Sequence, residues 1–71
     1  MRTPRLTPPK TYIVLRVDRE QGWFRGYDQF GRTQVTGKVE QAMHLSEREA
    51  EIVIYDLKFE RGGVWSKREV T

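Results

Sequence analysis

The residues of this chain that could carry out catalysis or hold a metal are few. The chain has no cysteine, which excludes disulfides, thiolate metal sites and a cysteine nucleophile. His44 is the only histidine, so no second histidine or cysteine can complete a zinc site with it. Glu47, Glu49 and Glu51 are two residues apart; on a helix they diverge, which suits a solvated first turn better than a metal cage. We therefore predict a protein without enzymatic activity, cofactor or bound metal.

The strongest candidate for a binding site is the aromatic stretch GWFRGYDQFGR, residues 22–32. Side chains alternate along a strand, so Trp23, Arg25 and Tyr27 would share one face and Phe24 would take the other. Trp, Tyr and Arg dominate the hot spots of protein interfaces, and aromatic side chains beside Arg also stack on bases. The alternative is that Trp23 and Tyr27 form cross-strand pairs that only stabilise the sheet. The predicted partner-binding residues are Trp23, Arg25, Tyr27, Arg16 and Arg32.

The chain has 71 residues, which is enough for one small domain with a small core. All three prolines lie in residues 1–10, which predicts an extended or disordered N-terminal arm before a single domain at 11–71. This arm has no apolar core of a signal peptide, and no apolar run approaches the ~20 residues that span a bilayer. A cytoplasmic protein without a membrane segment is expected.

Charge is distributed unevenly along the chain, whose net charge is +3. Residues 1–38 contain eight Lys/Arg and three Asp/Glu, a net charge of +5, whereas residues 39–71 contain five and seven, a net charge of −2. A basic half can attract an acidic protein surface or a phosphate backbone. The alternative is that these charges serve only solubility.

The first half of the chain predicts three strands in a meander. TYIVLRVD, residues 11–18, is rich in β-branched and aromatic residues, and WFRGY, residues 23–27, forms a second strand. DQFG, residues 28–31, has Asp first and Gly last, as a type I turn prefers. The third strand is predicted at 32–36, and one short helical turn at 39–43.

A helix is predicted to begin after Ser46. Ser46 and Glu49 have the spacing of a capping box, in which each side chain accepts a hydrogen bond from the backbone N–H of the other residue. Gly62 and Gly63 end this helix, and residues 64–70 form a last strand. The fold class is therefore α+β: a small antiparallel sheet in the order β-β-β-α-β with one helix packed on one face. The apolar stripe of the helix that would face the sheet consists of Ala50, Val53, Ile54 and Leu57.

A strand is the competing interpretation of residues 52–60. Val53, Tyr55, Leu57 and Phe59 alternate with polar residues there, and the sequence IVIY favours a strand. If the helix forms, Ile52, Tyr55 and Phe59 either widen its buried arc or leave an apolar edge exposed. The face that Trp65 takes on the last strand stays open at this stage.

The run from Tyr12 to Val70 resembles a type of small phage and prophage protein. Such proteins begin with a YIV-like strand and a meander containing GY, continue with a capped amphipathic helix and end in a strand. The matching positions here are Tyr12-Ile13-Val14, Gly26-Tyr27, Ala42, Leu45, Ser46, Glu49-Ala50, Val53 and Leu57. The resemblance implies the same α+β fold and no catalytic residue. Some phage proteins of similar build inhibit host defence machinery by binding it, which is analogy at the level of the fold.

These observations lead to one expected function and one alternative. We expect a non-enzymatic phage-like accessory protein that binds another protein and inhibits a host enzyme or defence complex. The alternative is a nucleic-acid-binding module that uses a basic and aromatic face of the sheet. If the sheet face opposite the helix is apolar, a homodimer through that face or through an edge strand would cover it.

Overall fold

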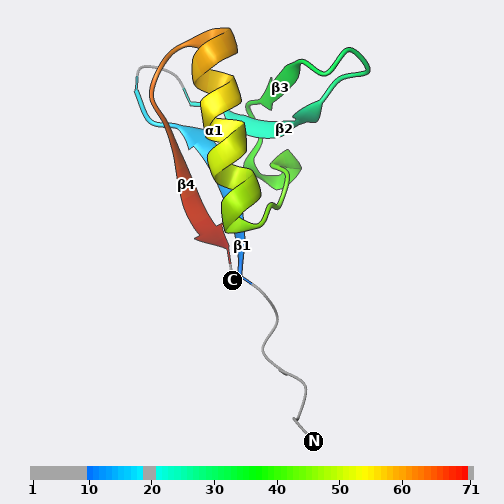
Figure 1. The fold of residues 1–71 in the computed structure, drawn as a ribbon. Coiled ribbons are helices and arrows are strands. Elements are labelled where there is room, and N and C mark those ends of the chain that lie inside the picture. Colours follow the sequence, from blue (N-terminus) through cyan, green and yellow to red (C-terminus); the bar gives the residue numbers. More distant parts are fainter. Residues whose placement is uncertain (1–9, 19–20, 71) are drawn as a thin grey trace, which may run out of the picture.

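The computed structural model describes residues 10–18 and 21–70 and confirms the α+β class. Four antiparallel strands form one sheet in the spatial order β3-β2-β1-β4, and one α-helix lies on one face of it (Figure 1). Residues 1–9 of the predicted N-terminal arm are outside the described part of the chain. The elements are β1 Thr11–Arg16, β2 Trp23–Tyr27, β3 Thr33–Thr36, the 3₁₀ turn η1 Val39–Gln41, α1 Glu47–Arg61 and β4 Trp65–Val70.

The helix forms where the capping box predicts it, and the strand interpretation of residues 52–60 is wrong. The Ser46 hydroxyl accepts a hydrogen bond from the Glu49 N–H at 3.2 Å, and the Glu49 carboxylate accepts one from the Ser46 N–H at 3.0 Å. At the other end, Gly62 has a φ of 69°, a left-handed conformation that favours glycine. Its N–H still donates to the carbonyl of Lys58, which closes the last turn of α1.

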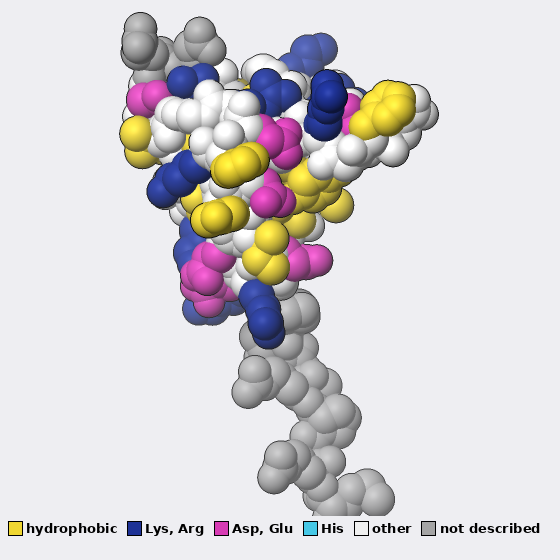
Figure 2. Space-filling model, turned by 45° about the horizontal axis from the view of Figure 1, so that its top comes forward, with side chains coloured by type: hydrophobic (Ala, Val, Ile, Leu, Met, Phe, Trp, Pro, Cys, Tyr) yellow, Lys and Arg dark blue, Asp and Glu magenta, His cyan; other side chains and the backbone are white. Residues whose placement is uncertain are grey.

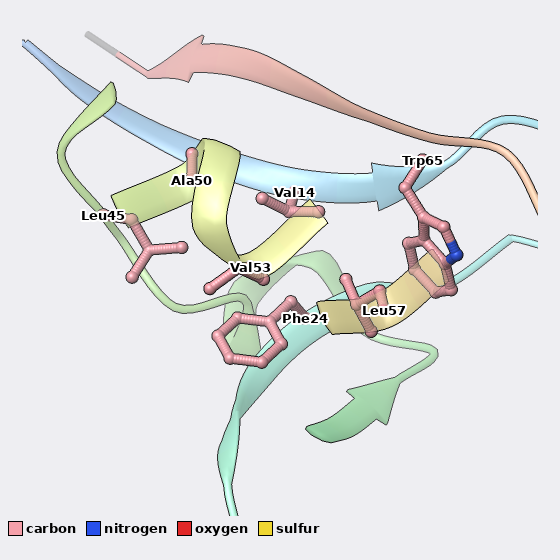
Figure 3. Packing of buried hydrophobic residues seen from close by; sticks show 7 residues of the cluster. All are labelled: Val14, Phe24, Leu45, Ala50, Val53, Leu57 and Trp65. Atoms are coloured by element: carbon pink, nitrogen blue, oxygen red, sulfur yellow. The ribbon is translucent and has the colours of Figure 1, made fainter. Parts of the chain in front are cut away.

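The core lies between α1 and the sheet (Figure 3). Val53 and Leu57 of the helix face Val14 of β1 and Phe24 of β2, and all four are buried. Ile54 also belongs to the predicted stripe. It lies off the centre of this contact and is only partly buried. Trp65 joins the core from β4, which decides the orientation that the sequence leaves open. The buried cluster is completed by Leu45 and Ala50.

The segment that precedes α1 lies between β1 and β2. Tyr12 and Leu45 exchange two backbone hydrogen bonds, of 2.7 and 2.8 Å, and the Met43 N–H donates to the Phe24 carbonyl at 2.9 Å. At Phe24, β2 is therefore hydrogen-bonded to this segment, and the rest of β2 pairs with β3, whereas Trp23 also pairs with Leu15 of β1. Within the described residues, no helix is both long enough and apolar enough to cross a membrane.

Strand β2 contains an irregularity at Arg25. Phe24 is paired with Val35 of β3, but the next pair along the ladder is Gly26 with Gln34, so Arg25 is an extra residue on β2. Gly26 has a φ of 138°, which side chains other than hydrogen rarely permit. An extra residue of this kind reverses the faces of the side chains that follow it.

Candidate interaction surface

The five residues predicted to bind a partner do not lie on one face. Trp23 is opposite Leu15 of β1 and points away from α1, because Phe24, its neighbour, lies under the helix. Tyr27 lies on the side of α1: its ring packs edge-to-face against Phe24, with 5.2 Å between the ring centroids. The prediction that Trp23 and Tyr27 share a face is wrong, because the bulge at Arg25 shifts the alternation by one residue.

Trp23 is half-buried, so it is not a freely projecting anchor. Its indole N–H is buried and has no hydrogen-bond partner within residues 10–18 and 21–70.

The three arginines of the predicted site are also dispersed. Arg16 forms an ion pair with Asp18, holding the pKa of that carboxyl below its usual value, and its guanidinium lies 5.8 Å from the ring of Trp65. Arg25 is exposed at the bulge, and Arg32 is exposed at the end of the turn, directly before β3. Only Arg25 and Arg32 therefore remain available as exposed cations of the hairpin.

An apolar stripe that the sequence leaves undecided lies on the outer side of α1. Ile52, Tyr55 and Phe59 are 54%, 72% and 83% exposed. They recur at helical spacing, on the side of α1 opposite its buried residues. Figure 2 shows apolar side chains following one another along the helix, with acidic side chains between them and the base of the hairpin. We call Ile52, Tyr55 and Phe59 the α1 stripe.

A groove of about 240 Å³ separates the first half of α1 from the hairpin. Its exposed walls are Tyr27 at the base of the hairpin, Met43 from the segment before α1, and Ile52 from the α1 stripe. Buried Phe24 also lines it, and Glu49 is the one charged side chain among the described residues that line it. The groove is therefore apolar with a carboxylate at its rim.

Two further carboxylates stand near this rim. Asp56 of α1 accepts a hydrogen bond from the Tyr27 hydroxyl at 2.6 Å. Glu60, one turn later, accepts hydrogen bonds of 3.1 Å from the N–H and the hydroxyl of Thr33. Both carboxylates have uncharged hydrogen-bond partners, so these contacts leave their negative charge in place. Burial and the Asp56 carboxylate raise the pKa of Tyr27 to about 12.

We expect the stability of the domain to fall at high pH because of Tyr27. The phenol of an unfolded tyrosine has a pKa of about 10. Between that value and the folded pKa of about 12, only the unfolded chain loses the proton, which favours unfolding. The contribution of Tyr27 to the free energy of unfolding is therefore complete below about pH 10 and is lost as the pH rises toward 12. Urea unfolding at a series of alkaline pH values should show this loss.

The matched variants for this measurement are Tyr27→Phe and Tyr55→Phe. Tyr27→Phe should remove the late phenolate transition seen by absorbance, and Tyr55→Phe should leave it in place. Asp56→Asn should move that transition to lower pH, because the carboxylate disfavours the phenolate. A late transition that persists in Tyr27→Phe would contradict the assignment.

His44 is exposed on the segment before α1. Within the described residues, no group of three or more His, Asp or Glu side chains is arranged to hold a metal ion.

Comparisons of the sequence and the structure with known proteins do not place the chain in a family. No protein-family model matches the chain, and neither a curated protein nor a solved structure shows significant similarity to it. The fold and the interaction surface therefore carry the functional argument.

Proposed function

We propose that this chain is a non-enzymatic accessory protein that acts in the cytoplasm by binding another protein. The observation that carries the proposal is the exposure of the α1 stripe, where three large apolar side chains, Ile52, Tyr55 and Phe59, face outward side by side. Exposed apolar side chains that adjoin one another on a small domain often mark a site of interaction with another molecule. The groove beside the stripe adds a place for one side chain of the partner.

The chemistry of the surface defines the partner. An apolar side chain fits the groove, and a cation beside it would meet the carboxylates of Glu49 and Asp56. The charge balance of the first half of the sequence favours an acidic partner, but the carboxylates at this surface favour a basic one. The resemblance to small phage proteins extends the proposal to inhibition of a host enzyme or defence complex by this contact.

The nucleic-acid alternative has less support. A stacking platform on a sheet needs aromatic and basic side chains on one face. Here Trp23 and Tyr27 lie on opposite faces, and Arg16 is paired with Asp18. Phosphates would also be repelled by the carboxylates beside the α1 stripe.

Affinity capture of the tagged protein from cell lysate, with and without nuclease, tests the proposal. We expect a discrete protein that survives nuclease treatment and is lost with the double variant Tyr55→Ser, Phe59→Ser. The control is Val17→Ser, Val64→Ser, which changes two exposed apolar residues that are not part of the stripe and lie beside each other. Partners that disappear with nuclease would support the alternative, and partners indifferent to both double variants would overturn the proposed surface.

A further inference from the structure

The turn of the β2–β3 hairpin presents one aromatic side chain on a fixed backbone. The Asp28 carboxylate accepts hydrogen bonds from the N–H of Phe30 at 2.8 Å and of Arg32 at 2.9 Å. The Gly31 N–H also donates to the Asp28 carbonyl at 3.0 Å, which closes the predicted type I turn. Phe30 is nevertheless 76% exposed. An aromatic side chain held this way loses little conformational entropy when it is buried by a partner.

Phe30 does not reach the groove of its own chain. The hairpin extends away from α1 (Figure 1), and an apolar side chain stands at the end of this projection (Figure 2). Phe30 is absent from the walls of the groove, which Tyr27 lines at the base of the same hairpin. The tip and the groove are thus two separate sites on the molecule.

The hairpin tip has the chemistry that the groove requires of a partner. Phe30 supplies an apolar ring, and Arg32, two residues later, supplies an exposed cation. The groove is apolar and has the Glu49 carboxylate at its rim, with Asp56 bonded to its Tyr27 wall. The hairpin tip and the groove of this chain are therefore both apolar, and the charges beside them are opposite.

We propose that the protein forms a twofold homodimer in which Phe30 of each copy enters the groove of the other copy. Arg32 then lies beside Glu49 and Asp56 of the other copy. Such a contact is reciprocal, because each copy contributes one tip and one groove, and a twofold axis closes it without further growth. This inference goes beyond the proposed function, because it assigns a second copy of the chain to the groove beside the α1 stripe.

Sedimentation equilibrium of the purified full chain over a concentration series tests this homodimer. We expect the wild-type protein to change from monomer to dimer as its concentration rises. Phe30→Ser at the tip and Ile52→Glu at the groove should each raise the dimer dissociation constant by roughly 100-fold or more, because every dimer loses the same anchor twice. Val64→Ser is the control, since Val64 is as exposed as Ile52, at 54%, but does not line the groove.

A mixture of the two variants separates this arrangement from other dimers. The tip of the Ile52→Glu chain is intact, and so is the groove of the Phe30→Ser chain. In a mixture, this tip can enter this groove, so a heterodimer with one complete contact should form. Neither variant alone should do so. Circular dichroism and urea unfolding of each variant confirm that loss of the dimer is not loss of the fold.

Two outcomes would overturn the homodimer. One is a wild-type chain that stays monomeric throughout the series, and the other is a dimer that Phe30→Ser leaves intact. If the chain is monomeric but captures a protein through Tyr55 and Phe59, the proposed function stands and this inference fails. If Phe30→Ser abolishes the dimer and no other protein is captured, the inference holds and the proposed function fails.

Discussion

Replacing Leu57 by Asp is expected to unfold the domain, whereas replacing Phe59 by Asp, two residues further along α1, is expected to leave it folded. Leu57 is fully buried against the sheet, and Phe59 is 83% exposed. A carboxylate forced into the core without a partner costs several kcal/mol. A domain of 71 residues has a total stability of only about 4–10 kcal/mol. The Leu57→Asp chain should therefore lose its far-ultraviolet helix signal and its cooperative urea transition.

This pair of variants tests the secondary structure of residues 52–60 directly. On a helix, positions 57 and 59 are about 200° apart, whereas on a strand they share one face. A strand would therefore make both substitutions severe or both mild. Unfolding by both variants, or by neither, would contradict the helix and its packing against the sheet.

The helix could be predicted because its signals are local. Ser46 and Glu49 are three residues apart in the sequence and bond to each other in the fold. The periodicity of Val53 and Leu57 then identifies the face that meets the sheet. The meander could be predicted for the same reason: the Asp28–Gly31 turn is closed by its own hydrogen bonds.

The candidate site was predicted less well because it depends on contacts between distant segments. Tyr27 changes face because β2 has an extra residue at Arg25, next to the point where the Met43 N–H donates a hydrogen bond to the Phe24 carbonyl. Gly26, an isolated glycine inside a strand, is the sequence signal that could have indicated the bulge. No comparable signal shows that Phe59 stays exposed, because nothing in a single sequence says which element covers a stripe.

The second large effect is expected at Trp65, which joins the last strand to the end of α1. Its side chain is 5% exposed, and its indole N–H donates a hydrogen bond of 2.8 Å to the Gly62 carbonyl just after the helix. Trp65→Ala removes a large buried ring and should lower the free energy of unfolding by about 3–5 kcal/mol. Trp65→Phe keeps most of the ring but loses the hydrogen bond, which should cost about 1–3 kcal/mol because the Gly62 carbonyl then loses its donor.

Trp23 provides the matched control, because the indole N–H that the substitution removes there makes no hydrogen bond to the described residues. Trp23→Phe removes an indole N–H that has no partner among the described residues, so no hydrogen bond within them is lost. Its urea midpoint should stay close to that of the wild type, while that of Trp65→Phe should fall clearly. If Trp23→Phe is the more damaging of the two, the indole ring of Trp23 contributes more to stability than the contact between Trp65 and Gly62, which would contradict this expectation.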